Sequence, residues 1–196
     1  MVRRRRSRRS LRPERRRLLV VTEGQATEPQ YVERLNQHLR DGPLTVSVRT
    51  VGVGKDPRLV VKKCVEERDR AAKAGKSFDH CVCLVDVDQH TTLAEAITTA
   101  AVEGIDVIVS RLKFEVWLLW HASESGASNT SRQLDELMSK HQLLTNSKHL
   151  SPHFPVANVD AATRRAFAAD AELAPGRIGP DPSSAMPILV EMMRGK

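Results

Sequence analysis

The stretch Leu18-Leu19-Val20-Val21-Thr22-Glu23-Gly24 decides the fold of this 196-residue chain. Its four consecutive apolar residues predict a strand that is buried on both faces, as in the centre of a parallel sheet. Thr27 then opens a predicted helix, with Glu28 and Pro29 in its first turn and apolar residues at helical spacing behind them. A buried strand, a turn with glycine and an amphipathic helix are typical of an α/β protein.

The same alternation of apolar runs and amphipathic stretches continues to Ser110. Further strands are predicted at 44–51, 81–87 and 105–109, and helices at 57–74 and 93–102. Strands separated by helices imply right-handed crossovers and a mostly parallel sheet with helices on both faces. From about residue 112 the pattern becomes helical, with helices predicted at 114–121, 132–144, 161–171 and 184–193. We therefore expect an α/β sheet followed by a helical C-terminal region.

The positive charge of the chain is concentrated at its start. The formal net charge is +7, but residues 1–17 hold ten arginines against Glu14, so they carry +9 and the remaining residues sum to −2. Like charges without apolar residues do not build a core, which predicts that residues 1–16 are a disordered Arg-rich tail. The tail could bind a polyanion without reading sequence, or it could do nothing specific. Residues 17–195 are expected to form one domain.

Membrane and disulfide classes are not favoured by the sequence. No run approaches the roughly 18 to 20 apolar residues that span a bilayer, and no apolar signal segment follows the arginines, so we expect a cytoplasmic protein. The three cysteines have neither the number nor the spacing of a disulfide framework or a zinc site. Cys81 and Cys83 lie two residues apart in a predicted strand, which predicts small buried groups on one face.

Acidic residues follow two of the predicted strands. Glu23 ends the first strand, and Asp86 and Asp88 end the third. Ligands of open α/β sheets gather at the carboxyl ends of the strands, so these side chains are expected to meet at one edge. Alternation directs Asp86 and Asp88 the same way, with Val87 turned into the core. Oxygen ligands favour Mg²⁺ or Mn²⁺, which implies a phosphate substrate, whereas the alternative is a set of solvated loop acids.

Three segments together resemble the RloB family: 19–31 (LVVTEGQATEPQY), 84–88 (LVDVD) and 110–119 (SRLKFEVWLL). The resemblance covers roughly residues 17 to 195. It implies a fold similar to the TOPRIM domain of topoisomerases, primases and related nucleases. It also implies a role in phage defence beside an ABC-like ATPase partner, with DNA or tRNA as the nucleic acid that is cut.

The resemblance also implies roles for single residues. Glu23 matches the TOPRIM glutamate, which is a metal ligand or a general acid/base, and Asp86 and Asp88 match its Asp-x-Asp pair. Glu28 matches the second acid of the EG-x-x-TE motif, where it reaches a second metal or only caps the helix. Glu115 matches the FE-x-W motif and could reach the same edge of the sheet as a catalytic residue.

The expected reaction is the hydrolysis of a phosphodiester bond with the help of Mg²⁺ or Mn²⁺. A cation would offset charge in the transition state, and the candidates for contact with the phosphate are Lys55, Arg111 and Lys113. Lys55 follows a glycine-containing turn that could cradle a phosphate or be an ordinary turn. The alternative function is a regulatory or nucleic-acid-binding subunit that does not cleave.

Overall fold

The computed structural model describes residues 16–39, 44–50, 56–87, 91–123, 130–146 and 148–195. Residues 1–15, which make up nearly all of the predicted tail, lie outside this part, as do Lys55 and Asp88. None of the helices in the described ranges is both long and apolar enough to cross a membrane.

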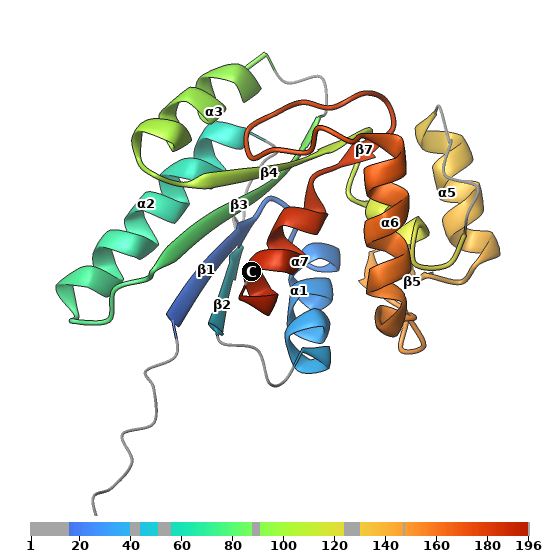
Figure 1. Cartoon of the computed structure of the whole chain (residues 1–196), viewed down its shortest axis with the longest axis horizontal. Helices are drawn as coiled ribbons and strands as arrows, with labels where there is room; N and C mark the ends of the chain where they lie inside the picture. Colours follow the sequence, from blue (N-terminus) through green and yellow to red (C-terminus); the bar gives the residue numbers. More distant parts are fainter. Residues whose placement is uncertain are drawn as a thin grey trace, which may run out of the picture.

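A five-stranded sheet lies at the centre of the molecule, with the strand order β2-β1-β3-β4-β7 (Figure 1). Its strands are β1 (Arg16–Thr22), β2 (Leu44–Thr50), β3 (His80–Val87), β4 (Asp106–Arg111) and β7 (Ser183–Ser184). The first four are parallel, and β7 runs antiparallel to β4. The predicted α/β class with a mostly parallel sheet is therefore confirmed. The sequence did not predict β7, because two serines carry no strand pattern.

Helices cover both faces of the sheet (Figure 1). One face packs on α2 (Pro57–Lys73) and α3 (Leu93–Val102), and the other on α1 (Thr27–His38), α4 (Glu115–Leu119) and α7 (Met186–Arg194). Strand β1 sends Leu19 and Val21 into the first core and Leu18 and Val20 into the second, as a strand buried on both faces requires. The three cysteines are buried in the first core and are free thiols.

The C-terminal region is mostly helical, as predicted, but three of its four predicted helices are shorter than the sequence pattern indicated. Its further elements are α5 (Ser131–Lys140), a hairpin of β5 (Leu144–Thr145) and β6 (His149–Leu150), the 3-10 turn η1 (Val156–Asn158) and α6 (Val159–Ala169). The helix predicted to reach residue 144 ends at Lys140, because Gln142 takes a positive φ of 52° and the chain turns into the hairpin.

Candidate functional site

Glu23 and Asp86 lie at the carboxyl edge of the sheet, on neighbouring strands. The backbone N–H of Glu23 donates to Leu84 O of β3 at 3.3 Å, so the turn after β1 stays beside β3. Two residues further along β3, Asp86 follows Leu84 on the face that carries α1 and α4, whereas Val87 packs against the α2 and α3 core. The alternation that the sequence predicts for Asp86 and Val87 is what the structure has.

Glu28 is fixed against the same turn. It occupies the first turn of α1, and its Oε1 accepts a hydrogen bond from Gly24 N at 3.1 Å. A Cβ on Gly24 would lie 2.1 Å from Glu28 Oε2, so only glycine leaves room for this carboxylate. Helix α1 has no side-chain cap, and Thr27 donates to Lys148 O instead. Glu28 therefore closes the turn that follows Glu23.

Glu115 is the first residue of α4, and Asp86 is connected to the start of this helix. The carboxylate of Asp86 accepts a hydrogen bond from the backbone N–H of Phe114. This bond places the first turn of α4 over the end of β3, next to the first turn of α1. Glu23, Glu28 and Glu115 are all close enough to Asp86 for their charges to act on it.

The acidic cluster, defined as Glu23, Glu28, Asp86 and Glu115, is electrostatically strained. Burial, followed by the charges of Glu28, Glu115 and Glu23, raises the pKa of Asp86 well above its usual value. Burial is also the main cause that raises the pKa of Glu28 to about 7, with Glu115 and Glu23 adding to it. Partly buried carboxylates that repel one another favour protons, or a cation, between them.

Lys113 and Asp135 flank the cluster on the side of Glu115. Lys113 Nζ lies 2.5 Å from Asp135 Oδ1 of α5. The pKa of Glu115 is raised mainly by burial; Asp135 raises it further, and Lys113 lowers it. These three side chains line a cavity of about 270 Å³ together with Met138, Ser139 and Leu144. The cavity therefore opens beside Glu115, the member of the acidic cluster that lines it.

Arg111, another predicted phosphate contact, does not line this cavity. Arg111 ends β4, and its Nη1 donates to Gly179 O at 3.1 Å, so it anchors the loop before β7. Lys55 belongs to the segment outside the described residues. Of the two predicted cations in the described residues, Lys113 is the one that the structure brings beside Glu115.

The donor chemistry of the acidic cluster fits a hard divalent cation. Carboxylate oxygens are the ligands that Mg²⁺ and Mn²⁺ prefer, and mutual repulsion is what a bound cation would relieve. In the described ranges, however, no three His, Cys, Asp or Glu side chains are already arranged around one ion position. Asp88 lies outside those ranges. Asp86, Glu23 and Glu28 would be the ligands, and side-chain rotations would have to bring their oxygens together.

A buried aromatic cluster that the sequence did not predict connects α1 to α4. The Tyr31 hydroxyl lies 3.2 Å from His121 Nε2, and His121 Nδ1 lies 3.1 Å from Trp117 O. Because Trp117 O can only accept, Nδ1 carries the proton and Nε2 accepts from Tyr31. Burial lowers the pKa of His121 to about 4, which keeps the ring neutral. His121 stands four residues after Trp117, a spacing that could have placed both on one helix face.

Comparison with known proteins identifies the family. The sequence model of the family described as RloB-like protein matches residues 18–193. The chain belongs to this family. The resemblance seen in its motifs is thereby confirmed, and it extends over both the sheet and the helical region of this RloB-like chain. No curated protein and no solved structure gives a significant match.

Proposed function

We propose that this RloB-like chain is a Mg²⁺- or Mn²⁺-dependent nuclease that cleaves phosphodiester bonds in DNA or tRNA. The observation that carries the proposal is the convergence of Glu23, Glu28, Asp86 and Glu115 at one edge of the sheet, where burial and mutual repulsion raise carboxylate pKa values. Perturbed carboxylates beside a cavity are typical of catalytic sites.

Each residue has a role in this proposal. Asp86, Glu23 and Glu28 would hold the metal, which when bound stabilises negative charge on a phosphate and acidifies water. Glu115 lines the same cavity as Lys113, and its raised pKa suits it to hold a proton and deliver it to the leaving oxygen. Lys113 would leave Asp135 and contact the substrate phosphate.

The biological setting is part of the same proposal. The resemblance to RloB proteins supports a role as the effector of bacterial phage defence that works with an ABC-like ATPase partner. The alternative is a subunit of such a complex that binds nucleic acid without cleaving it. One observation favours this alternative, namely that the described residues hold no ready-made set of three metal ligands.

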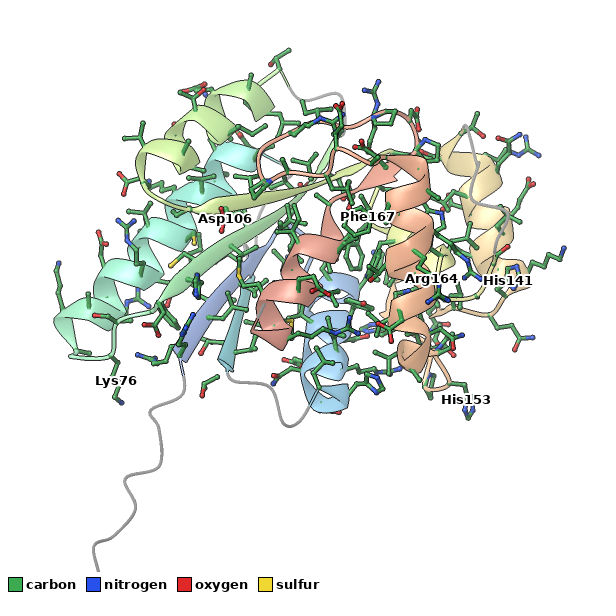
Figure 2. All side chains as sticks on the ribbon, viewed as in Figure 1. Lys76, Asp106, His141, His153, Arg164 and Phe167 are labelled. Carbon is green, nitrogen blue, oxygen red and sulfur yellow. The ribbon has the colours of Figure 1, made fainter. Side chains whose placement is uncertain are left out.

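A cleavage assay separates the two functions. The full chain is incubated with labelled DNA and tRNA in Mg²⁺ or Mn²⁺, with and without the partner ATPase, beside the variants Asp86→Asn and Asp106→Asn. Asp106 is a matched control, because it is the same residue type at the amino end of β4, away from the acidic edge (Figure 2). The proposal expects Asp86→Asn to lower cleavage by roughly 100-fold or more and Asp106→Asn to leave it intact. Cleavage that is equal in both variants would reject the nuclease assignment.

A further inference from the structure

A second charged cluster lies on the other face of the sheet. Glu67 of α2 is buried to 9% exposure, and three cations share its carboxylate. Lys63 Nζ and Arg70 Nη1 both lie 2.9 Å from Glu67 Oε1, and Arg49 Nε of β2 lies 3.6 Å from Oε2. We refer to Arg49, Lys63, Glu67 and Arg70 as the Glu67 cluster. Three cations on one carboxylate leave a local excess of two positive charges.

The ratio of cations to carboxylates in this cluster differs from that in other ion-pair networks in the described part of the chain. In four of them a single arginine is shared by two carboxylates: Arg58 by Asp56 and Glu95, Arg68 by Asp69 and Glu103, Arg177 by Asp170 and Glu172, and Arg194 by Asp160 and Glu191. Each of those networks carries one net negative charge, whereas the positive Glu67 cluster attracts anions.

The cations of the Glu67 cluster are accessible to a ligand. The side chains of Arg70, Arg49 and Lys63 are 70%, 51% and 31% exposed, so their charged groups are pinned at one side and open at the other. Strand β2 is an outer strand of the described sheet, with β1 as its one neighbour. A carboxylate that already orders long side chains lowers the conformational entropy lost on binding.

The position of Arg49 connects this surface to the acidic edge. Arg49 pairs in register with Val21 of β1, two residues before Glu23. It therefore lies near the carboxyl end of the sheet. Lys63 and Arg70 flank Glu67 on α2, and all three cations meet at its carboxylate, so they form one compact positive patch at the outer side of the sheet.

We infer that the Glu67 cluster binds the phosphate backbone of the nucleic-acid substrate, with Arg49, Lys63 and Arg70 as phosphate contacts. The inference rests on the proposed function in taking the substrate to be a nucleic acid. Charge complementarity supports it, since a patch of ordered cations matches the negative phosphates and reads no bases. The acidic cluster lies on the opposite face, so the strand would reach it around the carboxyl edge of the sheet.

The test is a binding experiment that involves no cleavage. Binding of the full chain to a fluorescent oligonucleotide is measured by anisotropy in EDTA over a series of salt concentrations, for the wild type and the double variant Arg49→Gln/Arg70→Gln. Lys63 is left in place, so Glu67 keeps an ion pair and the variant folds. The control is Arg132→Gln/Arg164→Gln, which removes the same charge from exposed positions on α5 and α6, where Arg164 points away from the sheet (Figure 2).

The loss of two phosphate contacts should make the negative slope of log K against log salt shallower by roughly 1.4 to 1.8. It should also weaken binding roughly tenfold at about 0.1 M salt. The control variant should show neither change. An equal loss in the control would assign the effect to overall charge and overturn the inference, as would unchanged binding in Arg49→Gln/Arg70→Gln. Polyglutamate serves as a second probe. If the double variant loses polyglutamate binding while its oligonucleotide binding is unchanged, the surface would instead be assigned to an acidic protein partner. Because binding is measured in EDTA, a negative result in the cleavage assay would not affect this test.

Discussion

Two glutamates on helices that pack against the same sheet have opposite surroundings. Glu28 of α1 is surrounded by other carboxylates, and its pKa is raised to about 7, mainly by burial. Glu67 of α2 is surrounded by Lys63, Arg70 and Arg49, and its pKa is lowered, first by its hydrogen bond from Lys63. The fold can evidently supply cations to a buried carboxylate, and it does so at Glu67. At the acidic cluster repulsion is left in place, which is typical of a site that takes up a ligand.

The largest change in stability is expected from Glu28→Gln in the metal-free protein. Because the pKa of Glu28 is raised, its ionisation costs the folded protein stability: this loss is absent below about pH 4.5, grows as pH rises, and is complete above about pH 7. Gln carries no charge and removes this loss, so Glu28→Gln should be more stable than the wild type at pH 8 by about 2 kcal/mol. Urea unfolding in EDTA at pH 4.5 and pH 8 measures the difference. Equal stability of the two proteins at pH 8 contradicts the electrostatic strain.

A smaller effect is expected from Gly24→Ala, and it should appear in metal binding. The added Cβ would overlap the Glu28 carboxylate, which is the end of a flexible side chain and can swing away. Since Gly24 does not need a positive φ, stability should change by less than about 1 kcal/mol. Calorimetry with Mn²⁺ should show affinity reduced roughly tenfold, because the hydrogen bond that holds Glu28 is lost. Wild-type affinity in this variant would remove Glu28 from the ligand set.

The smallest effect, and one of opposite sign, is expected from Glu67→Gln. Removing this carboxylate leaves Arg49, Lys63 and Arg70 to repel one another, so stability at neutral pH should fall by about 1 kcal/mol. Because the pKa of Glu67 is lowered, its contribution is present above its unfolded value and disappears as pH falls. The same urea measurements at the same two pH values apply. If Glu67→Gln were more stable than the wild type at pH 8, as is expected for Glu28→Gln, the proposed difference between the two clusters would be wrong.

The sequence predicts the parallel sheet because its strands are continuous apolar runs, a pattern that needs no tertiary information. This pattern does not predict strand β7, since Ser183 and Ser184 become a strand only by pairing with Arg111 and Ser110. The short helix α4 is likewise limited by a turn at Trp120.

The residues of the two charged clusters also differ in how far the sequence predicts their positions. Topology alone places Glu23 and Asp86 at one edge, whereas Glu28 and Glu115 came from family motifs, because their convergence depends on how α1 and α4 pack. Within the Glu67 cluster, the spacing of Lys63, Glu67 and Arg70 on one helix predicts local pairs. The arrival of Arg49 from β2 is set by the register of the sheet and is not visible in the sequence.

The central claim, that the acidic cluster holds a divalent cation, is tested most directly by Mn²⁺ titration calorimetry of the wild type, Asp86→Asn and Asp106→Asn at pH 6 and pH 8. The account predicts one or more bound ions in the wild type, tighter at pH 8 because Glu28 and Asp86 must release protons first, with binding retained in Asp106→Asn and lost in Asp86→Asn. Binding by Asp86→Asn that equals the wild type at both pH values would contradict it.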